Sequence, residues 1–272
     1  MTSMRESLHY TLIILILLLG TATFTPKCTY AGDDLAIVDP DETLAAKKTE
    51  KKGVDPTDFL IRLEVTNEYL NLPGGGHQNY TTPRGDYVID GKALLRLDVP
   101  IAYADLSGRD SAFGLGDVRF RFGALLFRKP IAAAAIGADV FFDTATAQDL
   151  GLGKYVVGPV AVVSFYPADW LRIYPNIKYR TSVAGDSARP EVNYFQVDVP
   201  FEFSLPRNWW IEVEPRTIVD FEDNERLTLL IEFETGKLIT KHIGLWVRPK
   251  FFVTGTKPYD FAVETGFRYL FD

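Results

Sequence analysis

The chain has 272 residues, of which 47% are hydrophobic and 13% aromatic, and its formal net charge is −7. An acidic balance of this kind argues against nucleic acid as a partner. The single cysteine excludes an intrachain disulfide framework, and the length suffices for one large all-β domain.

Residues 1–31 have the pattern of a secretory signal peptide. Arg5 precedes an apolar run at 11–19, which is too short to cross a bilayer as a helix and suits the core of a signal peptide. We expect cleavage after Ala31. Cys28 leaves lipidation as an alternative, but the residues before it lack the small apolar pattern of a lipobox.

Residues 32–57 differ in composition from the rest of the chain. They are rich in Asp, Glu, Lys and Ala, contain no Phe, Trp or Tyr, and include the run Lys-Lys-Thr-Glu-Lys-Lys at 47–52. Segments of low hydrophobicity and high charge cannot bury enough apolar surface to fold. We therefore expect a disordered, charged periplasmic leader. A docking segment for a periplasmic partner or peptidoglycan is the alternative.

Residues 58–272 alternate between apolar and polar positions, a period of two that is typical of strands. Leu229, Ile231 and Phe233, for example, alternate with Glu232 and Glu234. Tight turns alternate with longer polar connections, the first of which is expected at 71–83. The expected strands lie near 59–70, 84–89, 92–104, 116–127, 131–143, 154–166, 170–181, 192–205, 209–219, 226–235, 241–254 and 259–271.

The more apolar alternate set of these segments contains no Asp, Glu, Lys or Arg. Most segments have about ten residues or more, whereas strands of soluble sheets typically have about five or six, and about ten tilted residues cross a membrane. Short turns at one end and longer loops at the other are typical of outer-membrane barrels. We predict an all-β fold over 58–272, a transmembrane antiparallel up-and-down β-barrel of about 12 strands in contact with outer-membrane lipid. A secreted sandwich with its apolar face inward is the alternative.

The charged alternate set should then face the lumen, where it would line the path of a small-molecule solute. The candidate lumen-lining residues are Arg96, Asp98, Asp117, Arg119, Arg121, Arg172, Lys178, Arg180, Glu212, Glu214, Arg216 and Glu232. Two interpretations stay open. The charges neutralise one another in a water-filled interior, or a basic wall faces an acidic one and orients polar or zwitterionic solutes.

Four prolines conflict with this barrel. Pro159, Pro175, Pro215 and Pro249 fall in the lipid-facing set inside strands, and each lacks an N–H where water cannot replace the lost bond. Bulges or positions near the rim would accommodate them.

Two glycine-based motifs lie where loops enter strands: Gly114-Leu115-Gly116-Asp117-Val118-Arg119, and Gly151-Leu152-Gly153-Lys154-Tyr155 followed by Gly158-Pro159. With their spacing and the twelve-strand plan, 58–272 resembles the outer-membrane family named for the MetA pathway of phenol degradation. The resemblance implies a β-barrel that takes up small compounds, including aromatic or hydrophobic ones. Such barrels commonly end on an aromatic residue, so Tyr269 and Phe271 are the expected signal for the barrel-assembly machinery, although Asp272 follows them.

No catalytic residue, metal site or cofactor is predicted. A hydrolase would need a histidine beside a serine and an acid, but His77 lies in a glycine-rich segment and His242 has no serine on its strand. We therefore expect a passive small-solute channel in the outer membrane of a Gram-negative bacterium, and not an enzyme. The alternatives are a structural or adhesive barrel without transport and, less favoured, an outer-membrane lipid hydrolase.

Overall fold

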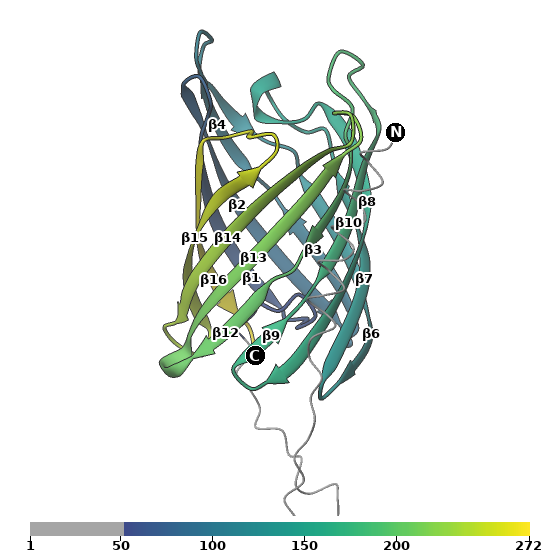
Figure 1. Cartoon of the computed structure of the whole chain (residues 1–272), viewed down its shortest axis with the longest axis vertical. Helices are drawn as coiled ribbons and strands as arrows, with labels where there is room; N and C mark the ends of the chain where they lie inside the picture. Colours follow the sequence, from purple (N-terminus) through teal and green to yellow (C-terminus); the bar gives the residue numbers. More distant parts are fainter. Residues whose placement is uncertain (1–51) are drawn as a thin grey trace, which may run out of the picture. The chain divides into compact units, whose positions relative to one another are not determined.

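The computed structural model describes residues 52–272, so the predicted signal peptide and residues 32–51 of the predicted leader lie outside the described residues. Residues 62–270 form one antiparallel sheet that closes on itself (Figure 1). Closure occurs because β1 (Arg62–Asn71) pairs with β16 (Phe261–Leu270) on one side and with β2 (Gly76–Ile89) on the other. Such a sheet has no free edge. Within residues 52–272, no helix is long and apolar enough to cross a membrane.

Sixteen strand segments build the barrel, and four of its strands are each split into two segments. The split strands are β3 (Ala93–Asp98) with β4 (Ile101–Leu106), β5 (Ala112–Leu115) with β6 (Arg119–Lys129), β9 (Leu171–Ile173) with β10 (Asn176–Gly185), and β11 (Asn193–Asp198) with β12 (Phe201–Leu205). The others are β7 (Ala132–Phe141), β8 (Lys154–Ala168), β13 (Trp209–Asp220), β14 (Arg226–Leu238) and β15 (Ile243–Thr254). Counted as continuous strands they number twelve, which confirms the predicted all-β barrel.

The four lipid-facing prolines occupy one-sided gaps in the hydrogen-bond ladders. The carbonyl of Pro175 accepts from the Val163 N–H at 3.1 Å, and that of Pro215 accepts from the Val199 N–H at 3.0 Å. Pro159 and Pro249 are paired with β7 and β16, while their registers with β10 and β14 skip them. Each proline therefore weakens one ladder and leaves the other intact, which the barrel tolerates.

The second strand is much longer than predicted. β2 begins at Gly76 instead of residue 84, so the connection expected at 71–83 is a turn of residues 72–75. Gly74, Gly75 and Gly76 have φ values between 81° and 97°, which glycine adopts without steric penalty. The alternation signal was missing because β2 carries the polar residues His77, Asn79 and Thr81 where the other strands carry apolar ones.

The two ends of the barrel differ in their connections. The turn end carries the connections at 90–92, 130–131, 169–170, 206–208 and 239–242, and the loop end carries those at 72–75, 107–111, 142–153, 186–192, 221–225 and 255–260. Short 3-10 helices lie in two of them: η1 (Gln148–Leu150) at the loop end and η2 (Pro206–Asn208) at the turn end. The C-terminus lies at the turn end (Figure 1).

The faces of the sheet are inverted relative to a soluble protein. Leu63 and Phe122 on the outer face are 55% and 50% exposed, whereas Glu64, Asp98 and Glu232 on the inner face are at most 4% exposed. Closed barrels of this kind satisfy their backbone polar groups within the sheet, so an apolar exterior suits lipid. The predicted assignment of apolar residues outward and charged residues inward is therefore correct.

An apolar cluster fills part of the interior at the turn end. It consists of Trp210, Trp246, Leu238 and Leu270, with Val54 and Leu60 packed against it. A Cβ on Gly236 would overlap the indole of Trp210, and one on Gly266 would overlap the indole of Trp246. These two glycines therefore make room for the two tryptophans.

Replacement of Gly236 by Ala should destabilise the barrel, because overpacking costs about 1–3 kcal/mol. We expect a lower temperature for loss of the folded band in a heat-modifiability assay. Gly85→Ala is the matched control, since a Cβ there meets its nearest neighbour, the Leu63 side chain, at 3.8 Å. Equal transition temperatures for the two variants would contradict the packing.

Candidate functional site: the lumen and its neck

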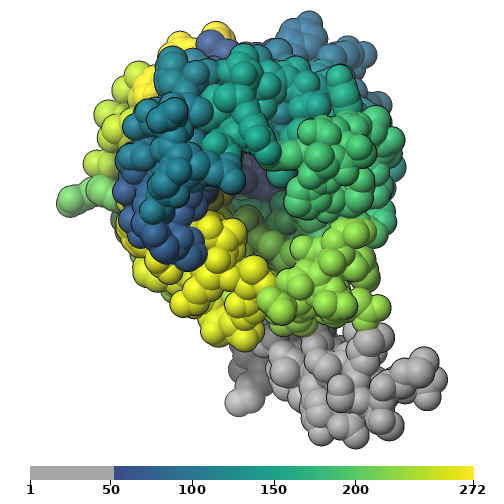
Figure 2. All heavy atoms as spheres, turned by 90° about the horizontal axis from the view of Figure 1, so that it is seen from above, coloured from purple at the N-terminus to yellow at the C-terminus, as the bar shows by residue number. Residues whose placement is uncertain are grey.

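The barrel encloses a lumen with two chambers, and its hollow is visible from the loop end (Figure 2). The chamber toward the turn end has a volume of about 320 Å³. The chamber toward the loop end has a volume of about 600 Å³. Arg84 on β2, Arg119 on β6 and Glu264 on β16 line both chambers. We call these three residues the neck, because the chambers meet there.

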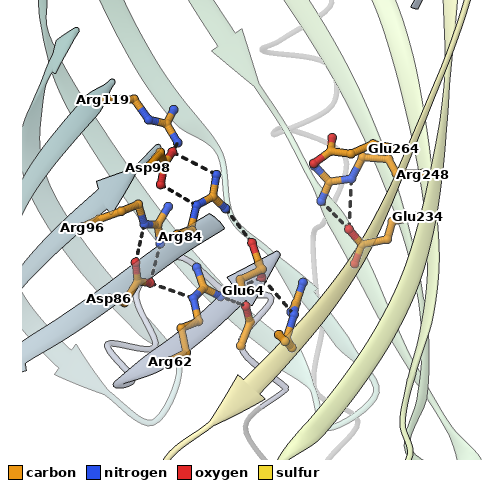
Figure 3. Close-up of polar contacts among 12 residues, drawn as sticks. Arg62, Glu64, Arg84, Asp86, Arg96, Asp98, Arg119, Glu234, Arg248 and Glu264 are labelled. Atoms are coloured by element: carbon orange, nitrogen blue, oxygen red, sulfur yellow. Dashed lines mark hydrogen bonds and ion pairs between the residues drawn. The ribbon is translucent and has the colours of Figure 1, made fainter. Parts of the chain in front are cut away.

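The register of the strands brings opposite charges together on one wall (Figure 3). Glu64, Arg84, Asp98 and Arg119 lie opposite one another on four neighbouring strands. Arg84 bonds Glu64 through Nη1 at 2.7 Å and Asp98 through Nε at 2.8 Å, and Arg119 also pairs with Asp98. The next row of inward-facing residues toward the turn end repeats the pattern. In this row, Asp86 lies between Arg62 and Arg96, at 2.7 Å from each. Cross-strand pairs of opposite charge stabilise a sheet.

The facing wall, on β11 to β15, is richer in carboxylates. Glu202, Glu212 and Glu234 lie side by side in register on three strands. Like charges in this position repel, so neighbouring donors are required. Arg248 Nε donates to Glu234 at 3.0 Å, and the Tyr174 hydroxyl donates to Glu212. Arg216 bridges Asp198 and Glu232 at 2.9 and 2.7 Å.

In most of these pairs the carboxylate is more deeply buried against the barrel wall than its cationic partner. The Asp139 side chain is fully buried against the wall, whereas that of its partner Arg121 is 17% exposed. The same order holds for Glu232 at 1% and Arg216 at 21%. The wall therefore holds the carboxylates, and the lumen surface consists mainly of guanidinium and ammonium groups.

The predicted lumen residues nearly all line a chamber. Ten of the twelve do so: Arg96, Asp98, Asp117, Arg119, Arg121, Lys178, Glu212, Glu214, Arg216 and Glu232. Asp117 also holds a loop in place, since its carboxylate accepts from the Leu152 N–H at 2.6 Å. Arg172 and Arg180 point inward but line neither chamber. Arg180 is covered, with Asp139 as its ion-pair partner and the Phe141 ring 4.8 Å away.

Arg84 and Glu264 at the neck were not among the predicted residues. The available signal was their place in alternation with inward-facing neighbours such as Asp86 and Arg268. The sequence did not show that β2 and β16, near opposite ends of the chain, both contribute side chains to the place where the two chambers meet. That convergence follows from closure of the barrel between β1 and β16.

An N-terminal segment, residues 52–60, lies inside the barrel at the turn end. Residues 52–57, which composition assigned to the disordered leader, thus belong to the barrel interior. Lys52 Nζ bonds Ser204 at 2.5 Å and Glu202 at 3.3 Å. Asp58 pairs with Arg128 at 2.9 Å and with Arg172 at 3.1 Å.

The middle of this segment is buried as deeply as the barrel wall. Thr57 is fully buried and Asp55 is 2% exposed, and both bond Ser164 on β8, at 3.1 and 2.7 Å. Phe59 packs against a cluster that includes Tyr174. Gly53, Val54, Pro56 and Phe59 of this segment line the turn-side chamber.

His77 and His242, the histidines within residues 52–272, have aromatic and backbone partners. The ring of His77 lies 5.5 Å from those of Tyr69 and Tyr103. His242 Nδ1 contacts the Leu270 carbonyl at 2.9 Å, and its ring stacks on Tyr269. Neither arrangement is the serine–histidine–acid geometry of a hydrolase. Across residues 52–272, no group of three His, Cys, Asp or Glu side chains is placed to hold a metal ion.

Asp139→Asn should destabilise the barrel strongly. The change leaves the buried Arg180 and the partly buried Arg121 without their shared carboxylate, and breaking a buried pair costs about 3–5 kcal/mol. Asp149→Asn is the control, because the Asp149–Arg109 pair is at the surface and worth about 1 kcal/mol or less. Urea denaturation in micelles, followed by tryptophan fluorescence, measures both. A midpoint for Asp139→Asn equal to that of the control would contradict the buried network.

Comparison with known proteins identifies the fold. No family model and no curated protein sequence matches the chain. The outer-membrane channel COG4313 of Pseudomonas putida F1 superposes with a TM-score of 0.63 at 10% identity, over 80% of this chain and all of that one. The KdgM porin gives 0.56 at 10% identity over 78% and 100%, and the NanC porin gives 0.54 at 12% over 77% and 99%. The barrel therefore has the fold of outer-membrane porins and channels.

Proposed function

We propose that this protein is an outer-membrane channel through which small polar solutes diffuse passively. The observation that carries the proposal is the charged lumen, two chambers that meet at a neck, inside a closed barrel with an apolar exterior. The export sequence supports an outer-membrane location, and so does the fold shared with outer-membrane channels.

The lumen favours hydrophilic solutes over the aromatic or hydrophobic compounds that the family resemblance implied. Guanidinium groups such as those of Arg121 and Arg216 are partly exposed to the chambers. An apolar solute would displace water from these charged groups without replacing its hydrogen bonds, which costs free energy. The lumen-lining residues predicted from the sequence are, on this proposal, the polar surface along which the solute moves.

A structural or adhesive barrel without transport is the second candidate. It is favoured by the N-terminal segment, whose ion pairs and apolar contacts occupy the turn end. The two candidates differ in whether solutes pass that segment.

Assembly is proposed to depend on Tyr269 and Phe271. Phe271 is 45% exposed, just beyond β16, and its N–H bonds the Ile61 carbonyl at 3.0 Å. Its ring meets the Tyr269 ring edge-on at 4.9 Å, which forms an aromatic end for the barrel-assembly machinery to recognise.

The double variant Lys52→Ala, Asp58→Asn should conduct better than the unaltered protein. It removes the ion pairs that hold the N-terminal segment against Glu202, Arg128 and Arg172, so the turn end should open more often. Single-channel current in planar bilayers measures the change, and we expect a severalfold increase in mean conductance.

Lys92→Ala is the control for the lysine substitution, because Lys92 lies exposed in a turn at the same end and its replacement removes the same charge as that of Lys52. Its conductance should equal that of the unaltered protein. Absence of current from the unaltered protein and the double variant alike would contradict a channel and favour the structural barrel.

A further inference from the structure

The neck presents guanidinium groups from β2 and β6 and carboxylates from the neighbouring strands β1 and β16. On one side, Arg84 and Arg119 flank the carboxylate of Asp98. The two arginine side chains are 19% and 21% exposed, whereas that of Asp98 is 6% exposed. This side therefore presents guanidinium groups to a passing solute.

Donors exceed acceptors on the arginine side. Asp98 accepts from both arginines, and Arg84 also binds Glu64, which Arg268 contacts at 3.2 Å. Arg119 Nε is buried with no hydrogen-bond partner among the described residues. The carboxylate of a solute would accept from the exposed parts of the two guanidinium groups.

The glutamates on β1 and β16, the strands next to β2, reverse this order of depth. Glu68 on β1 and Glu264 on β16 lie directly opposite each other in register, where like charges destabilise a sheet. Lys250 on β15 bridges them, with its Nζ at 2.5 Å from Glu68 and 3.0 Å from Glu264. The glutamate side chains are 28% and 15% exposed and that of Lys250 is 9% exposed, so this side presents carboxylates.

We propose that the neck binds small zwitterionic solutes that carry a carboxylate and an ammonium group, of the α-amino acid type. The inference rests on the proposed channel function and names the solute class. The solute's carboxylate binds Arg84 and Arg119 through charge-assisted hydrogen bonds, while its ammonium group binds Glu264 and Glu68.

Other solute classes fit the neck less well. A simple anion meets the glutamates, a simple cation meets the arginines, and an uncharged molecule gains neither ion pair. Selectivity therefore arises from repulsion as well as attraction.

Swelling of proteoliposomes in L-alanine and in lactamide tests the proposal. The two molecules have similar size and no net charge, but only alanine is zwitterionic. With the full chain, we expect alanine to enter about threefold faster than lactamide, the scale of a partly exposed ion pair. The alanine-to-lactamide ratio should fall to about one in Arg119→Gln and in Glu264→Gln, because each removes one side of the site.

Arg109→Gln is the matched control, because Arg109 pairs with Asp149 in the loop region, outside the neck, and should keep the ratio of the unaltered protein. Glu68→Gln replaces either neck variant that fails to give a heat-modifiable folded band. A ratio of one in the unaltered protein, or a ratio unchanged in the neck variants, would overturn the zwitterion site while leaving the channel in place. Entry of neither solute, with or without Lys52→Ala, Asp58→Asn, would contradict the channel and the site with it.

Discussion

The sheet of this barrel closes on itself, and closure determines where each strand and each side chain lies. In hydrocarbon, an unpaired backbone N–H or C=O costs several kcal/mol, so a membrane-spanning sheet must have no edge. β1 achieves this by pairing with both β2 and β16. Once closed, the sheet has one face toward lipid and one toward the lumen, and the period of two assigns every side chain to one of them. The four lipid-facing prolines show how much the ladders tolerate, since each disturbs a single side.

Closure also determines how the charges are arranged. Inward side chains at one level come from neighbouring strands, so Glu64, Arg84, Asp98 and Arg119 form a row of alternating sign. Carboxylates lie against the wall and the longer cationic side chains reach past them toward the axis, as Arg121 does over Asp139. At the neck, Glu68 and Glu264 break this order, since they are more exposed than their partner Lys250. The chemistry of the lumen thus depends on depth as well as on net charge.

The sequence predicts the barrel well and the lumen only in part. Strand number and the outward direction of residues such as Leu63 follow from alternation, which is a local signal. The start of β2 was missed because Asn79 and Thr81 interrupt that signal on the outer face. Burial of Lys52 was missed because its partners, Glu202 and Ser204, are about 150 residues away and composition indicates only solubility. The neck was missed for the same reason, since β2 and β16 meet only through closure of the barrel.

Site-specific fluorescence tests the inverted arrangement of faces most directly. A bimane fluorophore would be attached to single cysteines at Leu97 on the outer face and at Thr82 in the loop-side chamber, in a chain with Cys28 replaced by Ser. In bilayers with brominated acyl chains, we expect strong quenching at position 97 and little at position 82. Position 82 alone should react with a charged, water-soluble thiol reagent. Quenching at position 82 together with reagent access at position 97 would contradict an apolar face toward lipid and a charged face toward the lumen.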